Sequence, residues 1–429
     1  MRKSASLLLP ALAFLALPLA AASVSAAKPE EVGVSSERLK RIGQMIQRRI
    51  DAGDITGAVT LVARKGRVVH LEALGVMDLE SKKPMARDTM FRIASMTKPV
   101  TGLAIMMMLE EGKVRLTDPV SRFIPEFRGM KVAVALPSQG RGGGQAGRGG
   151  DQAGRGGPPP VPQFYTMPAE REITVRDLLT HVSGLASGPM SNSEAEKLNR
   201  LPEENLASYI PRLGSTPLEF QPGSRWAYSS QAGFDTLGRI VEIASGMTLD
   251  QFFRQRIFSP LGMKDIYFWP PDETWPRVAT PYQRTPAGLQ KPPNPNFMSS
   301  KVYFMGSGGL ITTAEDYLPL GVMLANGGQL NGKRLLSPKT VEMMRSVHAP
   351  DTLPGRPPGE GFGLSVRVVS DHAKRGTLLS TGSFGWSGYY GTHFFVDPVE
   401  QVVGLLMVQT ANPDVQRDFE DMVMQAIVE

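Results

Sequence analysis

The sequence predicts an α/β (α+β) fold in which one antiparallel β-sheet is flanked by helices and interrupted by a largely helical insert. Three observations predict this class. Strand-like stretches lie near both ends of the 429-residue chain, an amphipathic helix accompanies each set of strands, and the middle of the chain is mainly helical in pattern. Strands from both ends are therefore expected to meet in one sheet.

The N-terminal elements are a helix and a hairpin. Residues 35–53 (SSERLKRIGQMIQRRIDAG) carry apolar side chains at helical spacing, with a serine for the N-cap and a glycine at the end. Residues 57–75 then resemble two β-strands, with Lys65 and Gly66 at the turn between them. These elements form the first part of the predicted sheet.

The C-terminal region repeats this texture. Its strand-like stretches are FGLSVRVV, GTHFFVDP and QVVGLLMVQT (362–369, 391–398 and 401–410), and the closing helix is VQRDFEDMVMQAIVE (415–429). We therefore expect residues 27–120 together with 345–429 to form the sheet domain, and residues 121–344 to form the mainly helical insert.

The first 26 residues resemble a secretory signal peptide. Arg2 and Lys3 are basic, an apolar run follows, and small residues precede an expected cleavage after about Ala26. A membrane anchor is the alternative, but the run is short and contains two prolines. No later segment is apolar for long enough to span a bilayer, and the chain has no cysteine. The sequence thus predicts an exported bacterial protein, periplasmic or secreted, without a membrane span in its mature form.

Residues 136–163 form a low-complexity segment that contains QAGRGG twice. Because nothing in it can bury apolar surface, we expect a disordered, solvent-facing loop within the insert. An RGG tract can indicate RNA binding. The formal charge of +6 is spread along the chain without a basic cluster, however, so no nucleic-acid partner is expected. Nothing in the sequence fixes the oligomeric state.

A serine and a lysine stand at the start of a strongly apolar segment. Pro99 marks the first helical turn, because proline has no N–H to offer, and Gly112 marks the end. Three residues turn a helix by about 300°, so Ser95 and Lys98 share one face of a helix whose apolar middle predicts burial. A buried amine beside a hydroxyl can accept its proton. The S-x-x-K pattern also occurs by chance, so these residues alone leave a surface lysine and an N-cap serine possible.

Several stretches together resemble the serine β-lactamase and penicillin-binding-protein superfamily, in the class C-like branch close to its carboxylesterases. They follow the family order along most of the mature chain. They are MFRIASMTKPVT, TVRDLLTHVSGL, PGSRWAYSSQAGFDTLGRIVEIASG, FSPLGMKDIYF, GSGGLITTAEDYL and SFGWSGYYGTHFFVDP. The resemblance implies a β-lactamase-like fold.

The resemblance also implies a catalytic set. Ser95 matches the acylated nucleophile, Lys98 the lysine that activates it, and Tyr228 the tyrosine of a Y-x-N/S element. Acyl transfer needs a nucleophile, a base and donors for the oxyanion, which agrees with these roles. The matched oxyanion donors are the backbone N–H groups of Ser95 and Tyr389. The matched substrate-binding residues are Ser230, Trp386, Ser387 and Gly388.

The third motif departs from the β-lactamase pattern. That position is usually Lys-Thr-Gly, whereas this chain has Trp-Ser-Gly at 386–388. Trp386 brings apolar area and an indole donor but no positive charge for a substrate carboxylate. We therefore expect an exported serine hydrolase that acts on small carboxylic esters. The alternatives are a β-lactamase or a D-amino-acid peptidase on cell-wall peptides and, in another class, a non-catalytic peptidoglycan- or acyl-binding module.

Other catalytic chemistries lack their signatures. The chain has no G-x-S-x-G elbow, no H-E-x-x-H, no phosphate-binding loop and no dinucleotide fingerprint, so no metal and no cofactor is expected. Of the five histidines, His181 at a helix end is more typical of a structural turn than of a base. His70 and His393 lie in expected strands without an obvious partner.

Overall fold

A computed structural model describes residues 24–137 and 161–429 of the chain. The predicted signal peptide (1–26) and the predicted disordered loop (136–163) therefore lie almost entirely outside the described residues. Within the described part, no helix is both long enough and apolar enough to cross a membrane.

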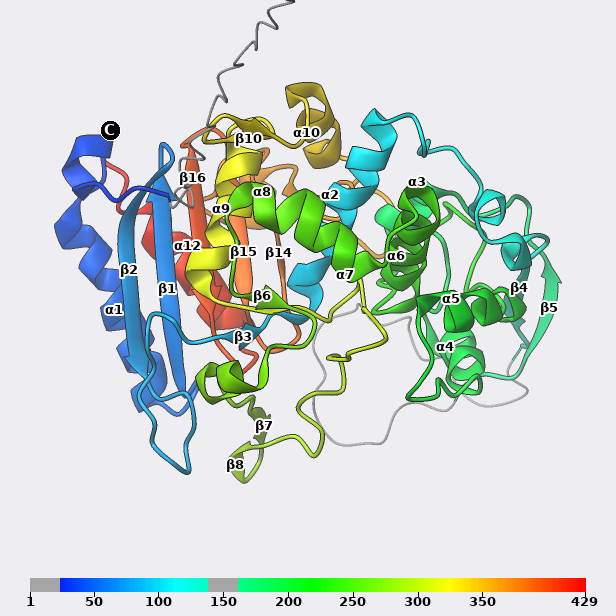
Figure 1. The fold of residues 1–429 in the computed structure, drawn as a ribbon, viewed down its shortest axis with the longest axis horizontal. Coiled ribbons are helices and arrows are strands. Elements are labelled where there is room, and N and C mark those ends of the chain that lie inside the picture. The colour runs from blue at the N-terminus through cyan, green and yellow to red at the C-terminus, as the bar shows by residue number, and fades with distance from the viewer. Residues whose placement is uncertain (1–23, 138–160) are drawn as a thin grey trace, which may run out of the picture.

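A seven-stranded antiparallel sheet forms the centre of the molecule (Figure 1). The hairpin from the N-terminal region pairs directly with the last strand of the chain: Val59 in β1 lies opposite Met407 in β16. This pairing confirms a sheet built from both ends. In spatial order the strands are β12 (Glu360–Phe362), β13 (Arg367–Val369), β14 (Phe384–Ser387), β15 (His393–Asp397), β16 (Val402–Met407), β1 (Gly57–Arg64) and β2 (Arg67–Gly75).

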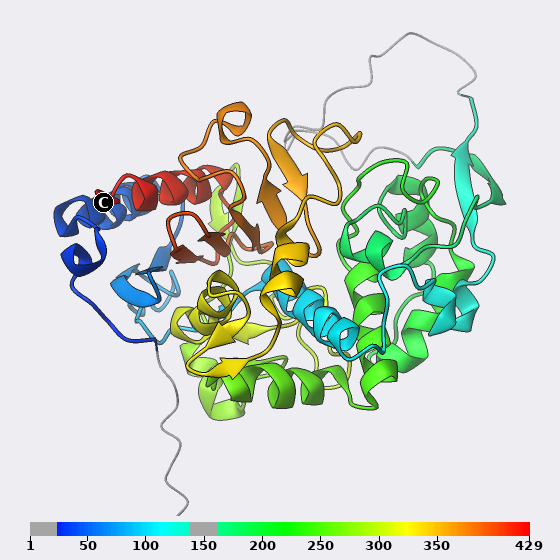
Figure 2. The same cartoon turned by 90° about the horizontal axis from the view of Figure 1, so that it is seen from above.

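Helices cover both faces of the sheet. Side chains alternate along β1, so that Val59, Leu61 and Ala63 belong to one core cluster, whereas Ala58 and Val62 belong to another. The first cluster includes helix α9 (Ala314–Ala325), and the second includes α1 (Ser36–Asp51) and α12 (Pro413–Met424). Figure 2 shows α1 and α12 side by side along the sheet, as their mutual contacts require. The result is a three-layer arrangement.

The remaining elements lie beyond the sheet, mostly in the region between β2 and α9. The small sheets use β3 (Phe91–Arg92), β9 (Ile311–Thr312) and β6 (Ile266–Tyr267); β4 (Lys131–Ala135) and β5 (Phe164–Pro168); β7 (Gln283–Thr285) and β8 (Gly288–Gln290); and β10 (Gln329–Leu330) and β11 (Lys333–Arg334). The other helices are α2 (Thr97–Glu110), α3 (Val175–Leu179), α4 (Pro189–Glu196), α5 (Leu206–Tyr209), α6 (Ala232–Ser245), α7 (Leu249–Phe252), α8 (Ser259–Leu261), α10 (Pro338–Arg345) and α11 (His372–Arg375).

Several predicted elements are confirmed with small changes at their ends. Helix α1 is capped by the Ser35 hydroxyl, which accepts a hydrogen bond from the Arg38 N–H. Lys65 and Gly66 both have positive φ, at 50° and 71°, as a tight hairpin turn requires. Helix α2 is buried along nearly its whole length, as its apolar sequence predicts.

One predicted strand is wrong. The segment 362–369 is not continuous but divides into the end of β12 and the whole of β13. Between them Ser365 has a φ of 72°, and the Gly363 N–H donates to the Val366 carbonyl at 2.8 Å. The apolar residues there line a tight turn, so alternation alone could not separate one long strand from a hairpin.

The sheet unit also extends beyond its expected boundary. Helix α9 lies within residues 121–344, which the sequence assigns to the insert, yet it packs on β15, β16 and β1. The contact is close: a Cβ added at Gly321 would lie 2.6 Å from Val403 of β16. Helix α9 therefore belongs to the layers of the sheet.

Candidate active site

The serine of the S-x-x-K motif sits in a tight turn between a strand and a helix. Ser95 lies in a 3₁₀ turn (Ala94–Met96) that connects β3 directly to α2. Ala94 has a φ of 43°, a conformation that costs a non-glycine residue about 1–3 kcal/mol and that is concentrated at functional sites. The turn leaves Ser95 partly exposed at the N-terminal end of a buried helix. The side chain is thus presented for reaction on a rigid support.

Lys98 is held beneath this serine and is completely buried, with 0% exposure. Its Nζ lies 3.1 Å from Ser95 Oγ, 2.7 Å from the Ser230 carbonyl and 2.8 Å from the Ser307 carbonyl. Two N–H groups therefore point at backbone oxygens, which can only accept hydrogen bonds. The third position of the amine faces the serine hydroxyl.

Tyr228 completes the cluster from a distant part of the chain. Its hydroxyl lies 2.7 Å from Ser95 Oγ, and Lys98 Nζ lies 5.0 Å from the centre of its ring. The phenol is only half-buried, unlike the lysine. The three residues for which the sequence predicts catalysis therefore converge within hydrogen-bonding distance of one oxygen atom.

A buried histidine supports the tyrosine from behind. The His181 ring lies 4.7 Å from the Tyr228 ring, and its Nδ1 accepts a hydrogen bond from the Ser229 N–H at 3.2 Å. Complete burial lowers the pKa of His181 well below its ordinary value, and the positive charges of Lys98 and Arg356 lower it further. A neutral imidazole whose Nδ1 already accepts from the backbone supports the tyrosine segment, and the φ of 58° at His181 agrees with the structural turn that the sequence predicts there.

Aromatic side chains form one wall of the site. The Trp386 ring lies 5.7 Å from that of Tyr228 and 5.1 Å from that of Phe362, and the Trp226 ring lies 5.9 Å from Phe362. This wall is neutral where it meets Tyr228. The third motif thus contributes its tryptophan to the site.

The turn after Trp386 docks on the residue two places before Ser95. The Gly388 N–H donates to the Thr392 carbonyl at 2.7 Å, and the Thr392 hydroxyl donates to the Ile93 carbonyl at 3.2 Å. A Cβ at Gly388 would lie 2.2 Å from Thr392 Oγ1 and 2.3 Å from the Ile93 oxygen, so only glycine fits. This contact brings Tyr389, which is 55% exposed, to the edge of the Ser95 turn. The oxyanion role of the Ser95 and Tyr389 amides stays a prediction that this placement permits.

Ser387 does not join the site through its side chain. Because neighbouring strand residues face opposite ways, Trp386 points to the Tyr228 side and Ser387 to the α12 side. The Ser387 hydroxyl contacts His393 Nδ1 at 2.9 Å and Gln416 Oε1 at 3.2 Å. The Ser387 hydroxyl is therefore held on the α12 side, and the substrate-binding role that the resemblance implies for Ser387 stays a prediction.

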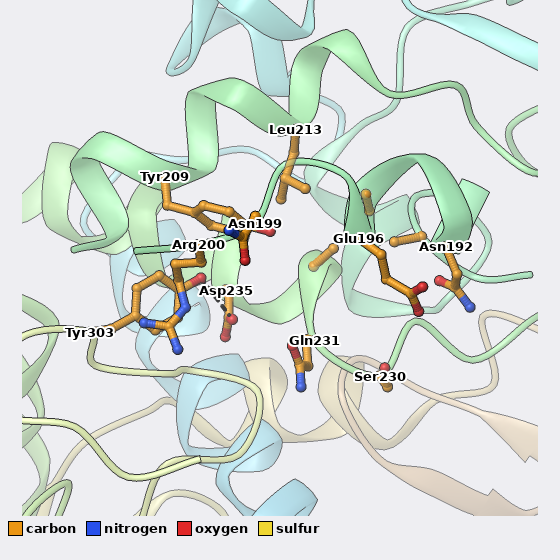
Figure 3. Close-up of a pocket in the computed structure, with 13 residues that line it drawn as sticks. Asn192, Glu196, Asn199, Arg200, Tyr209, Leu213, Ser230, Gln231, Asp235 and Tyr303 are labelled. Atoms are coloured by element: carbon orange, nitrogen blue, oxygen red, sulfur yellow. Dashed lines mark hydrogen bonds between the residues drawn. The ribbon is translucent and has the colours of Figure 1, made fainter. Parts of the chain in front are cut away.

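A cleft of about 370 Å³ adjoins the cluster at Ser230 (Figure 3). The Ser230 carbonyl holds Lys98, and the residue itself is exposed. Asp235 is buried within the same cleft and accepts from Tyr303 Oη at 3.0 Å and from the Ser307 N–H at 2.9 Å. The cleft is lined by Ala186, Asn192, Ala195, Glu196, Asn199, Arg200, Tyr209, Leu213, Ser230, Gln231, Ala232, Asp235 and Tyr303.

The sequence did not identify two residues that support the site, Ser307 and Asp235. Ser307 lies in GSGGL, which reads as a glycine turn, and its carbonyl carries no sequence signal of its own. Asp235 lies one turn into α6 on the face that meets Ser307, and the available signal was an acidic residue among the apolar residues of the first half of this helix. Burial raises the pKa of Asp235, although its hydrogen bonds and Lys98 act in the opposite direction.

Comparison with known proteins agrees with this geometry. The family model described as Beta-lactamase matches residues 42–429. Protein Rv1367c of Mycobacterium tuberculosis is 36% identical over 86% of this chain and 89% of its own length. Esterase EstB of Burkholderia gladioli is 32% identical over 83% of this chain and 86% of its own length. The solved structure of EstCE1, a hydrolase with promiscuous acyltransferase activity, superposes with a TM-score of 0.73 at 28% identity and covers 92% of this chain and 99% of that one.

Proposed function

Since the chain belongs to the beta-lactamase family and is a serine hydrolase of that fold, we propose that it is an esterase that cleaves small carboxylic esters through an acyl-enzyme on Ser95. The observation that carries this proposal is the convergence of Lys98 Nζ and Tyr228 Oη on Ser95 Oγ, at 3.1 Å and 2.7 Å. The similarity to Esterase EstB supports the choice of substrate class.

The proposed reaction has two steps. Ser95 Oγ attacks the ester carbonyl carbon and loses its proton to the cluster, and the tetrahedral intermediate then expels the alcohol, which takes that proton. Water next attacks the acyl-enzyme carbonyl, gives a proton to the same base, and releases the carboxylic acid while Ser95 regains its hydrogen. Ser95 lies directly before α2, so the positive N-terminal end of this helix is near the place where the substrate oxyanion forms.

The difference in exposure between Lys98 and Tyr228 favours Tyr228 as the residue that carries the proton. Lys98 is fully buried and two of its N–H groups are committed to carbonyls, so it cannot reach an alcohol in the cleft. Tyr228 is half-exposed and contacts Ser95 directly. In this scheme Lys98 holds Ser95 Oγ in place from below, and Tyr228 carries the proton from the serine to the leaving group.

At the position of the third motif, the aromatic wall offers apolar surface to an ester and no cation to the carboxylate of a β-lactam. Trp386 occupies the position at which a lysine would offer a cation to a β-lactam carboxylate, and its neighbours Tyr228 and Phe362 are also uncharged. An apolar surface beside the nucleophile suits a short acyl chain. We therefore expect ester hydrolysis to exceed cephalosporin hydrolysis by a wide margin.

A labelling and turnover experiment tests the proposal. The purified protein is incubated with a fluorophosphonate, and mass spectrometry locates the adduct, which is expected on Ser95. In parallel, 4-nitrophenyl butyrate, a chromogenic cephalosporin and a D-Ala-D-Ala peptide are compared as substrates. Tyr228→Phe removes only the phenol oxygen and is expected to lower kcat by about 10²- to 10⁴-fold. Tyr267→Phe, at a tyrosine in β6, is the matched control.

Two results would contradict parts of this proposal. Cephalosporin turnover comparable with that of the butyrate ester would contradict the role given to Trp386. A protein that turns over none of the three substrates and takes no label on Ser95 would be a binding module for acyl or peptidoglycan ligands, and the esterase proposal would fall.

Export is part of the proposal and depends on the N-terminal sequence alone. Arg2, Lys3 and the apolar run that follows predict removal of the segment up to about Ala26. Mass spectrometry of the mature protein from culture medium or periplasm would show this new N-terminus, and a full-length cytoplasmic protein would contradict it.

A further inference from the structure

The cleft beside Ser230 is a polar extension of the active site. It begins at Ser230, whose carbonyl holds Lys98, and Asp235 in the same cleft accepts from the Ser307 N–H, while the Ser307 carbonyl also holds Lys98. Amide and hydroxyl groups dominate the lining shown in Figure 3, in contrast to the aromatic wall around Trp386. A substrate bound at Ser95 therefore meets an apolar surface on one side and a polar cleft on the other.

Arg200 is the one cationic side chain among the residues that line this cleft. Its guanidinium carbon lies 4.2 Å from the centre of the Tyr303 ring, which supports it from one face. Within the described ranges 24–137 and 161–429, no carboxylate lies within ion-pair distance of Arg200. Stacking fixes the plane of the group and leaves its N–H edge available to a ligand.

No acidic residue described in the cleft pairs directly with this arginine, and nearby Glu204, which feels its charge, is paired with Arg212 at 2.5 Å. Both carboxylate oxygens of Asp235 are engaged, one by Tyr303 Oη and one by the Ser307 N–H. Glu196 lies across the cleft from Arg200 and Tyr303 (Figure 3). One available cation near two carboxylates favours a ligand with a single negative charge over a dianion.

We propose that this cleft recognises a carboxylate carried by the ester substrate, with Arg200 as the residue that determines this specificity. The inference rests on the proposed ester hydrolysis at Ser95 and adds a substrate class to it: half-esters or esters that bear a free acid group. A guanidinium binds a carboxylate through two parallel hydrogen bonds, which is the geometry that a stacked arginine offers. The carboxylate is on either the acyl or the alcohol portion, and the two arms of the test distinguish them.

The acyl arm compares 4-nitrophenyl hydrogen adipate with 4-nitrophenyl hexanoate. The alcohol arm compares 4-butyryloxybenzoate with 4-butyryloxybenzamide. In at least one arm, kcat/KM for the acid is expected to exceed that for its neutral partner by about tenfold or more, the worth of a charge-assisted hydrogen bond. Arg200→Gln is expected to reduce this ratio to about one, because only the acid loses its charge-assisted contact.

The control is Arg225→Gln. Arg225 also stacks on an aromatic ring, with its guanidinium carbon 4.8 Å from the centre of Phe220, but it does not line the cleft. It should keep the wild-type preference. Equal rates for acid and neutral ester in both arms, or a preference that survives Arg200→Gln, would overturn the proposal.

A binding measurement separates this inference from the esterase proposal. If the wild-type protein hydrolyses no ester, the proposed function fails, and the cleft is then tested by titrating Ser95→Ala protein with monomethyl adipate and dimethyl adipate. Tighter binding of the half-acid, lost in Arg200→Gln, supports carboxylate recognition. Equal binding of the two compounds would refute it independently of turnover.

Discussion

Strand β14 has a cluster of a serine hydroxyl and titratable side chains on each of its two faces. On the cleft side, Ser95 contacts Lys98 and Tyr228. On the α12 side, the Ser387 hydroxyl lies 2.9 Å from His393 Nδ1, and His393 Nε2 lies 3.0 Å from Glu420. The second cluster has the residue types of a Ser–His–acid triad, yet the first is the candidate active site.

Their surroundings explain the difference. His393 has no exposed surface, and Glu420 also bonds Arg367 at 2.7 Å and Arg375 at 3.0 Å. Burial opposes ionisation of Glu420, but the nearby Arg367, His393 and Arg375 hold its pKa below the usual range. The carboxylate is thus committed to structural ion pairs, and the Ser387 hydroxyl is occupied by His393 and by Gln416 in the first turn of α12. A hydrogen-bonded trio acts as a nucleophile only where the serine is accessible and an oxyanion can be stabilised.

The largest expected effect comes from exchanging the two serines for alanine. Ser95→Ala removes the proposed nucleophile and should lower kcat by about 10⁴-fold or more. Ser387→Ala removes one hydroxyl on the opposite face and should change kcat by less than about threefold. Steady-state kinetics on 4-nitrophenyl butyrate measure both, and fluorophosphonate labelling should persist only in Ser387→Ala. Comparable losses in both variants would mean that the second cluster takes part in catalysis.

The next largest effect on turnover is expected at Gly388, in the turn that follows β14. Gly388→Ala places a methyl group against Thr392 Oγ1 and the Ile93 carbonyl, so the turn has to move away from the Ser95 loop. Because small displacements of catalytic groups are costly, we expect kcat/KM to fall by about 10²-fold. A crystal structure or thermal unfolding of the variant checks that the fold persists. Wild-type kinetics in a folded Gly388→Ala protein would show that this contact does not position the site.

The smallest effect on turnover, and the largest on stability, is expected at Glu420. Glu420→Gln removes the nearer carboxylate of Arg367 and Arg375, which keep Glu360 at 3.8 Å and 3.4 Å, so the loss of unfolding free energy should be at most the about 3–5 kcal/mol that breaking a buried pair costs. Asp414→Asn, at an exposed ion pair with Arg417, should cost less than about 1 kcal/mol. Urea unfolding measures both, and kcat of folded Glu420→Gln should stay near wild type.

Acid should reveal the same carboxylate. Folded Glu420 stays ionised where an unfolded glutamate, with its ordinary pKa of 4.5, takes up a proton. Its contribution is therefore complete above about pH 4.5 and is lost as the pH falls below that value. The unfolding free energy of wild type should decline more steeply in this range than that of Glu420→Gln. Parallel pH dependences would place the stabilising charge elsewhere.

The sequence was most informative where local chemistry repeats a pattern. The hairpin at Lys65–Gly66, the buried helix after Ser95 and the antiparallel sheet from both chain ends follow from turn residues, proline placement and hydrophobic periodicity. The Ser95, Lys98 and Tyr228 set came from motif resemblance, because the sequence distance between Lys98 and Tyr228 is too large for periodicity to relate them.

The features that the sequence could not predict depend on backbone atoms and on the direction in which side chains point. The carbonyls of Ser230 and Ser307 hold Lys98, and a carbonyl has no residue identity to read. The motif could not show that the Ser387 side chain faces away from Tyr228, because a motif names three consecutive residues, whereas a strand presents only alternate residues to a given side. The sequence could not pair His393 with Glu420, because only the packing of helix α12 on the sheet brings these two residues together.

The union of the two chain ends in one sheet has a consequence for biosynthesis. Strand β1 is made early, but β16, its partner on one side, leaves the ribosome only near the end of translation. Until then the apolar edge of β1 has no neighbour, and the loop carrying Ser95 has no Gly388 turn to rest on. The edge of β1 and the support of the Ser95 turn therefore both depend on contacts between distant parts of the chain, and such contacts form late in folding.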